Sequence, residues 1–420
     1  MRALLGSKEQ LHRVREASST FARSMAWPHI GDAYFDVIER TLRTNSRPRA
    51  RQWRPSDAPG STLASSLPEL SLDHLARLTD DTGVIQHATY CVPARRSGYC
   101  VDDNARALIV AVHADRLQGT AQTRRMVTTY LSYLLHSQEP DGSFRNFMSY
   151  TRVLDTAPAS DDCIGRAIWA LGVTAHLAED DGCRLLAREM LLRALPHANE
   201  LGPRGTAQVV LGVVSFLTVD PAVEGVRDVL DRMVRRLIDR YRDHASADWR
   251  WFEPTLTYDN ALLPLALFAA YGVTGERTAL RDARESLEFL EEICFDGDRL
   301  KLVGNTGWHS KGGEKASADE QAIDAAAFVL AFRCAYVVTE DRHYLRRMRE
   351  AFAWFLGANR LGLPMYDFAT GGCHDGMGES QINQNEGAES TICFLMSLLK
   401  MLELAGEGLE PNSVPTSSDN

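Results

Sequence analysis

The chain has 420 residues, of which 45% are hydrophobic and 24% are charged, proportions typical of a globular protein with a sizeable core. Its 56 acidic residues outnumber its 46 basic residues, giving a formal net charge of −10. This balance argues against nucleic acid and anionic membranes as partners, because both attract basic surfaces. A neutral ligand such as a sugar is compatible with it.

Cysteine usage and the N-terminal segment both favour a cytoplasmic location. The eight cysteines are scattered without a CxxC pair, and buried free thiols are their ordinary interpretation. Reduced thiols are typical of the cytosol. The segment MRALLGSKEQLHRVREAS has no long apolar region of the kind found in a secretory signal. The sequence has no run of about 18 apolar residues, so it predicts no membrane span.

The chain divides by composition into four parts. Residues 1–45 form a polar extension with a helical pattern that Pro28 interrupts. Residues 46–69 are rich in Arg, Pro and Ser without periodicity, and they are predicted to be a linker. Residues 70–408 form the body, and residues 409–420 are predicted to be a disordered tail.

The body repeats one theme, in which a polar loop leads into an apolar helix and a charged amphipathic helix follows. The apolar helices are expected to begin near Asp103, Asp162, Arg204, Tyr258, Glu320 and Glu386. Apolar helices must be buried, whereas helices with one charged face must be exposed. Six of each, with LDHLARL as the sixth charged partner, predict an inner and an outer ring, which is an all-α (α/α)6 toroid. The alternative is an open solenoid, which would need polar capping repeats that the chain does not clearly show.

Carboxylates stand at or near the start of most apolar helices. They include Asp102, Asp103, Asp161, Asp162, Glu253, Asp259, Glu320, Glu386 and Glu389. The N-termini of the inner helices of a toroid lie on one side, so these acids are expected to converge around one mouth. Capping and the helix dipole also favour acids in a first turn, and for Asp161 and Asp162 this is the simpler explanation.

Two groups of acids suggest more than capping. Asp102 and Asp103 are paired in GYCVDDNARAL, beside Tyr99 and Arg106, and one cap needs only one acid. Glu253 lies in the aromatic stretch WRWFEPTLTY, a setting that raises a carboxyl pKa by desolvation and suits a general acid.

The start of the last apolar helix and two glycine-rich loops hold further candidates. Glu386 and Glu389 share one helix face after the polar loop GESQINQN, and are expected to face a ligand. Trp308 and His309 stand in GNTGWHSKGGEKASADE, and Asp375 stands in PMYDFATGGCHDGMGES. Aromatic rings beside acids suit stacking on a sugar ring.

The sequence carries little that favours a metal or a cofactor. A metal site that uses His309, His374 and nearby acids is an alternative, but no HExxH or paired-His spacing supports it. The chain also shows no GxGxxG after a strand, no Walker loop and no GxSxG elbow. We therefore expect no metal and no cofactor.

The six-hairpin pattern and the run QEPDGSFRNF resemble the six-hairpin glycosidase-like family, which includes glycoside hydrolases, unsaturated-uronyl hydrolases and sugar 2-epimerases. GYCVDDNARAL, WFEPTLTYDNALLP and WFLGANRLGLPMYDFATGGCHDGMGESQINQNEGAESTICFL are similar to uncharacterised bacterial proteins joined to, or encoded with, glycosyltransferases. This resemblance covers roughly residues 70–405. TFARSMAWPHIGDAYFDVIERTL resembles the closing helices of two-domain glycosyltransferases, whose nucleotide-sugar domains this chain lacks. The resemblance implies a carbohydrate ligand and association with a glycosyltransferase, without assigning a catalytic pair.

The leading hypothesis is a glycoside hydrolase acting on an oligosaccharide, with a mannose-containing glycan as the candidate substrate. Hydrolysis needs a proton donor at the glycosidic oxygen and a carboxylate that activates water or attacks carbon. Glu253 is the expected acid and Asp103 or Glu386 the expected base, with inversion preferred because most toroidal glycosidases invert. The expected substrate-binding residues are Tyr99, Asp102, Arg106, Asp162, Trp251, Tyr258, Asp259, Trp308, His309, Glu320, Asp375 and Glu389.

Two other functions remain open at this point. A sugar epimerase or isomerase of the same fold would use histidines as acid and base, and only His309 and His374 stand in loops expected at the mouth. A non-catalytic glycan-binding partner of a glycosyltransferase would instead have widely separated, solvated carboxylates. A terpenoid cyclase is remote, because Asp102 and Asp103 do not form a DDxxD motif.

Overall fold

The computed structural model describes residues 8–24 and 67–407. Most of the predicted linker, 46–69, and all of the predicted tail, 409–420, lie outside these residues. The structure therefore leaves those two predictions as they stand.

The chain splits into two compact units, Met1–Arg51 and Gln52–Asn420. In the first, helix α2 (Lys8–Ser24) lies in the segment where a helical extension is predicted. The second holds the other helices and strands of the described chain.

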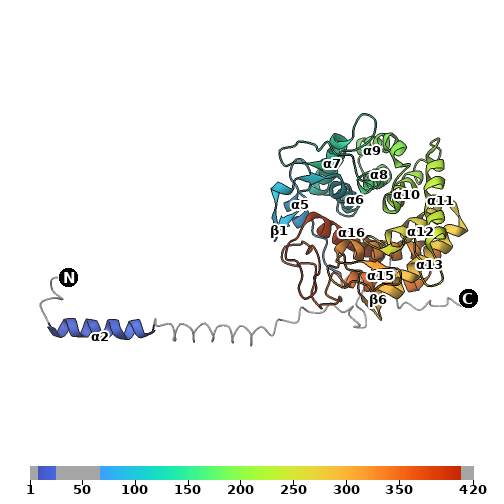
Figure 1. Cartoon of the computed structure of the whole chain (residues 1–420). Coiled ribbons are helices and arrows are strands. Elements are labelled where there is room, and N and C mark those ends of the chain that lie inside the picture. Colours follow the sequence, from blue (N-terminus) through green and yellow to red (C-terminus); the bar gives the residue numbers. More distant parts are fainter. Residues whose placement is uncertain (1–7, 25–66, 408–420) are drawn as a thin grey trace, which may run out of the picture. The chain divides into compact units, whose positions relative to one another are not determined.

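Six apolar helices of the larger unit form a closed inner ring. They are α6 (Val101–Gln118), α8 (Asp161–Leu177), α10 (Pro203–Leu217), α12 (Leu262–Thr274), α14 (Ala322–Thr339) and α16 (Ala388–Gly406). Each packs against the next, and α16 packs against α6, so that the arrangement closes (Figure 1). The ring excludes the open solenoid.

Amphipathic helices form the outer ring, each packed mainly on one inner helix. They are α5 (Asp73–Leu78), α7 (Ala121–Ser137), α9 (Asp181–Ala194), α11 (Val226–His244), α13 (Arg277–Cys294) and α15 (Arg342–Ala353). α5, the short sixth partner, packs against α16. The prediction of an all-α (α/α)6 toroid is confirmed.

Small residues allow two inner helices to approach closely. A Cβ built on Gly172 of α8 would lie 2.0 Å from the carbonyl oxygen of Gly212 of α10. Since no side chain fits in that space, the two glycines allow the α8 and α10 backbones to pack in direct contact.

Short antiparallel strand pairs tie together the loops at the ring. They are β1 (Ala88–Thr89) with β2 (Val92–Pro93), β3 (Tyr99–Cys100) with β4 (Phe147–Met148), β5 (Thr255–Leu256) with β8 (His309–Ser310), and β6 (Phe295–Asp296) with β7 (Arg299–Leu300). Two 3-10 turns, η1 (Arg95–Ser97) and η2 (Leu195–Ala198), complete the elements. The β3–β4 pair joins the loops before α6 and α8, and the β5–β8 pair joins the loops before α12 and α14.

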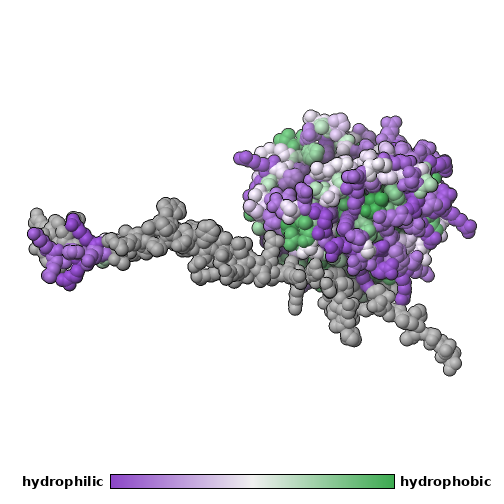
Figure 2. Space-filling model, turned by 60° about the horizontal axis from the view of Figure 1, so that its bottom comes forward, coloured by the Kyte–Doolittle hydropathy of each residue, from purple (hydrophilic) through white to green (hydrophobic). Residues whose placement is uncertain are grey.

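Within the described residues, α14 is long and apolar enough to cross a membrane. It packs between α12 and α16 and is 61% buried, so its place in the inner ring accounts for its composition. The face of the larger unit in Figure 2 is mainly hydrophilic, with separate hydrophobic patches.

Candidate active site

A charged cluster lies at the N-terminal ends of four inner helices, α6, α8, α12 and α16, and begins with Arg106 of α6. Its guanidinium donates to Asp103 Oδ1 at 2.8 Å and to Glu389 Oε2 at 2.9 Å. The Cys100 thiol donates to Asp103 Oδ2 at 3.2 Å. Asp103 is buried, whereas the Glu389 side chain is 46% exposed. Glu389 is therefore the more accessible of the two carboxylates.

A second buried guanidinium, that of Arg166 in α8, extends the cluster. It lies 3.9 Å from Asp259 Oδ2 and 4.0 Å from Glu389 Oε2. Arg166 was not a sequence candidate. The sequence does hold a signal for it, because Arg166 is the charged residue in the otherwise apolar stretch CIGRAIWALG. A charged side chain in a buried helix needs a partner of opposite charge.

Asp162, at the start of α8, faces the loop before α12. Its Oδ2 accepts from the Tyr258 hydroxyl at 2.6 Å, and its Oδ1 accepts from Gln208 at 3.4 Å. The Arg204 guanidinium lies 4.6 Å from the centre of the Tyr258 ring. Asp162 and Tyr258 are both partly exposed, so a ligand at this end of the ring can reach them.

Asp102 differs from the other acids of the cluster because its carboxyl group accepts no hydrogen bond within the described chain. It is partly exposed, and its Oδ1 is buried without a hydrogen bond from the described chain. Burial raises the pKa of Asp102, as do the nearby charges of Asp162 and Asp103, against the opposing effect of Arg166 and Arg106. The result is a carboxyl group that can hold a proton.

The cluster as a whole contains more carboxylates than cations. Five acids, namely Asp102, Asp103, Asp162, Asp259 and Glu389, surround two guanidinium groups. Burial raises the pKa of Asp259 to about 6. For Glu389, burial alone would raise the pKa, but Arg106 and Arg166 outweigh it and lower the pKa. The pKa values of these carboxyl groups are therefore shifted in opposite directions within one cluster.

The structure places Glu253 outside this cluster. Its carboxylate accepts from Arg204 at 2.9 Å and lies 3.8 Å from Arg240. The aromatic surroundings predicted from the sequence are present, since Trp251 and Phe252 are fully buried. Glu253 is nevertheless not the free side chain expected of a proton donor, because its ion pair with Arg204 holds the carboxylate in place.

Three further candidates are structural and cannot touch a ligand in this conformation. Trp251 and Tyr99 have no exposed surface, and the Tyr99 hydroxyl donates to Asp80 at 2.6 Å. Glu320 is 1% exposed and accepts from Trp354 at 3.0 Å and from Arg360 at 3.1 Å. Their assignment as substrate-binding residues is corrected, because burial closes them to solvent.

The remaining candidates lie in the segments that precede α14 and α16. Asp375 Oδ1 accepts from the Gly387 amide at 2.7 Å and so anchors the start of α16. Trp308 is partly exposed. His309 is 9% exposed, and its Nδ1 has no hydrogen-bond partner in the described chain.

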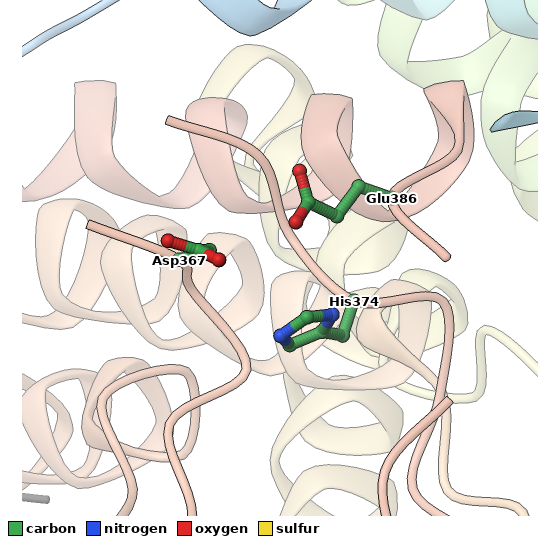
Figure 3. Close-up of side chains that lie close together, drawn as sticks. All are labelled: Asp367, His374 and Glu386. Carbon is green, nitrogen blue, oxygen red and sulfur yellow. The ribbon is translucent and has the colours of Figure 1, made fainter. Parts of the chain in front are cut away.

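Glu386, an expected catalytic base, lies in a different group of side chains from the charged cluster. It is 3% exposed, and its carboxylate lies near Asp367 and His374 (Figure 3). The sequence reasoning placed it beside Glu389 on one helix face. The structure begins α16 only at Ala388, so Glu386 belongs to the preceding loop.

Exposed aromatic side chains beside the cluster were missed by the sequence reasoning. Phe147 of β4 pairs with Cys100 of β3, and Cys100 stands two residues before Asp102. The Phe147 side chain is 46% exposed. Tyr150 is 42% exposed, and Arg95 lies 5.8 Å from its ring centre. Exposed rings of this kind offer faces on which a sugar could stack.

Comparison with known proteins gives similarity at the level of the fold. No protein-family model and no curated protein matches the chain. A sugar epimerase from a ruminal bacterium superposes with a TM-score of 0.61 at 12% identity, covering 86% of this chain and 98% of that chain. The GH76 α-mannanase of Bacteroides thetaiotaomicron gives a TM-score of 0.57 at 10% identity, with coverages of 80% and 94%. An inactive variant of a Salegentibacter GH76 α-1,6-mannanase, in complex with α-1,6-mannotriose, gives 0.53 at 13% identity, with coverages of 79% and 96%. These likenesses establish the six-hairpin (α/α)6 fold, at identities too low to transfer an activity.

Proposed function

We propose that the protein is a carbohydrate-active enzyme that hydrolyses a glycosidic bond, with the charged cluster as its active site. The observation that carries the proposal is Asp102, a partly exposed acid with a raised pKa and a buried oxygen without a partner. Within hydrogen-bond reach of a glycosidic oxygen, such a carboxyl group can donate the proton that the leaving sugar needs.

Asp162 is the proposed base. It lies close enough to Asp102 for its charge to raise the pKa of that group. The Tyr258 hydroxyl donates to it, which fixes the orientation of the carboxylate that activates water in this proposal. Glu389, whose side chain is 46% exposed, is left to bind a sugar hydroxyl, and the buried Arg106 and Arg166 hold its carboxylate. We retain inversion as the expected outcome, and the anomeric form of the first product tests it.

The Salegentibacter mannanase supports a role for consecutive aspartates. Its inactive variant carries asparagine at two consecutive positions that are aspartate in the active enzyme. The present chain has two such pairs at inner-helix starts, Asp102 with Asp103 and Asp161 with Asp162. A mannose-containing oligosaccharide is therefore the first substrate to test.

A sugar epimerase or isomerase is the second candidate, since structural similarity extends to such enzymes. One observation favours it: His309 and His374 are both buried, and among the described residues neither Nδ1 has a hydrogen-bond partner. Imidazoles are the usual proton carriers in such reactions. The coupled, half-buried carboxylates argue against a purely glycan-binding protein, which would be expected to keep them separated and solvated.

Product analysis separates these functions. The purified protein is incubated with manno- and gluco-oligosaccharides and with free sugars, and products are followed by mass and by reducing-end assay. Hydrolysis releases new reducing ends with uptake of water. Mass-neutral conversion of a free sugar would instead establish the epimerase, and binding without any conversion would contradict both enzymes.

Two expectations from the sequence also belong to this proposal. We propose that the protein acts in the cytoplasm, on its scattered cysteines and its N-terminal segment without a long apolar region. We also propose that it associates with a glycosyltransferase, on the resemblance of its N-terminal segment and of the motifs in its body. Co-purification with a glycosyltransferase from the native host tests the association, and cell fractionation tests the location.

A further inference from the structure

A hairpin before α16 brings Asp367 and His374 beside Glu386. The Asp367 amide donates to the Gly372 carbonyl at 2.9 Å, and the His374 amide donates to the Met365 carbonyl at 2.8 Å. One ligand atom from each of Asp367, His374 and Glu386 lies within 4.8 Å of the other two. In Figure 3 the three side chains point toward one another.

Glu386 is a buried carboxylate without a cationic partner in the described chain. Its Oε2 accepts from the Thr370 hydroxyl at 2.7 Å and lies 3.5 Å from His74 Nδ1. His74 Nε2 donates to the Glu386 carbonyl at 2.8 Å, and Arg77 donates to His74 Nδ1 at 3.1 Å. Because a guanidinium can only donate, the contact from Arg77 means that His74 Nδ1 carries a lone pair and cannot neutralise the carboxylate. A buried carboxylate normally needs a cation or a proton.

His374 presents a second unsatisfied group at the same place. It is 8% exposed, and its Nδ1 has no hydrogen-bond partner in the described chain. The edge of its ring that carries the nitrogens faces the two carboxyl groups (Figure 3). Asp367 Oδ1 accepts from the Ala369 amide at 2.7 Å, which leaves its second oxygen free to turn toward the others.

We propose that Asp367, His374 and Glu386 bind a divalent transition-metal ion such as Zn²⁺. One imidazole and two carboxylates suit Zn²⁺ better than Mg²⁺ or Ca²⁺, which prefer oxygen ligands alone. Ligand atoms about 2.1 Å from a tetrahedral ion lie about 3.4 Å apart, so small side-chain rotations would close the site. Three protein ligands leave a position for water or a ligand hydroxyl.

Gly372 fits this assignment. A Cβ at this position would lie 2.3 Å from Glu386 Oε2, so only glycine lets the carboxylate reach the hairpin.

The sequence predicted no metal, because its ligands follow no helical His spacing. They meet only through the hairpin and the loop that follows it.

Metal binding by the full chain, measured without sugar, tests this inference independently of the proposed reaction. The protein is treated with a chelator, dialysed against buffered Zn²⁺, and analysed for bound metal and for melting temperature. We expect one Zn²⁺ per chain and a raised melting temperature, with little response to Mg²⁺. His374→Ala should weaken binding at least about 100-fold, and Asp367→Asn about tenfold.

His343→Ala is the matched control, because His343 also lies beside a carboxylate, 2.8 Å from Glu291, outside the proposed site. It should leave the stoichiometry and affinity unchanged. The inference is overturned if the wild type binds no Zn²⁺, or if His374→Ala and Asp367→Asn bind it as the wild type does. Circular dichroism of each variant shows whether it is folded, and the partly exposed Asp367 provides a test even if His374→Ala unfolds.

Discussion

The two ends of the inner ring are built from the same six helices and differ sharply in chemistry. At the N-terminal end, five carboxylates surround Arg106 and Arg166. At the C-terminal end lies a pocket of about 310 Å³, lined mainly by apolar side chains such as Val173 and Leu211. The charged groups there are matched, since Glu403 lies 3.0 Å from His113 and 2.9 Å from Lys400.

This difference bears on the helix-capping explanation of the acids. Cys100 and Ser160 cap α6 and α8, so neither Asp102 nor Asp162 is needed as a cap. Capping and the helix dipole favour acids in a first turn, but they do not account for this excess of carboxylates over cations. The surplus of negative charge at one end is what distinguishes a candidate site from ordinary helix ends.

The largest expected effect follows from removing the proposed proton donor. Asp102→Asn should lower kcat about 1,000-fold on a verified substrate, because the amide cannot donate a carboxylic proton. His176→Ala, at the apolar end, is the control and should keep activity within about twofold. Steady-state kinetics measure both, and full activity of Asp102→Asn would remove this residue from the mechanism.

Packing near the apolar end should be the next most sensitive feature. Gly172→Ala places a Cβ 2.0 Å from a backbone oxygen of α10, so the free energy of unfolding should fall by about 3 kcal/mol. Gly272→Ala is the matched control, since its Cβ would meet only a Val338 methyl group at 3.3 Å. Urea denaturation compares the two, and equal stabilities would mean that the close approach of α8 and α10 is not required.

The pH dependence of stability should have opposite signs at the two ends. The pKa of Asp259 is raised to about 6 in the folded state, against about 3.9 when unfolded. The folded protein therefore binds the proton more tightly, and stability falls as the pH rises from about 4 to about 6. Asp259→Asn should remove this slope and stabilise the protein at pH 7 by about 2 kcal/mol. An unchanged slope in denaturation at several pH values would contradict the assignment.

Glu403 should show the reverse behaviour and the smallest effect. Burial alone would raise its pKa, but hydrogen bonds from His113 and Lys400 outweigh it and lower the pKa to about 2. Its contribution is therefore present at neutral pH and is lost as the pH falls from about 4.5 to about 2. Glu403→Gln should cost about 1 kcal/mol at pH 7 and leave kcat unchanged. Loss of activity would mean that the apolar end takes part in the reaction.

The fold could be predicted from the sequence because alternating apolar and charged helices report burial directly. Ring closure then follows from their number. The pairing of charges could not be predicted, since it depends on how each helix is rotated about its axis. Arg204 lies 49 residues before Glu253 in the chain, and nothing in the sequence indicates that the two side chains form an ion pair. Arg166 was missed for the same reason, and Glu386 was misplaced because α16 begins two residues later.

The central claim is that a sugar binds at the charged end of the ring with its scissile bond at Asp102. A crystal structure of Asp102→Asn with a manno-oligosaccharide tests it most directly. We expect a glycosidic oxygen about 2.6–3.2 Å from the side chain of residue 102, with a sugar hydroxyl on Glu389. A glycan bound at Glu253, or in the apolar pocket at the opposite end, would contradict it.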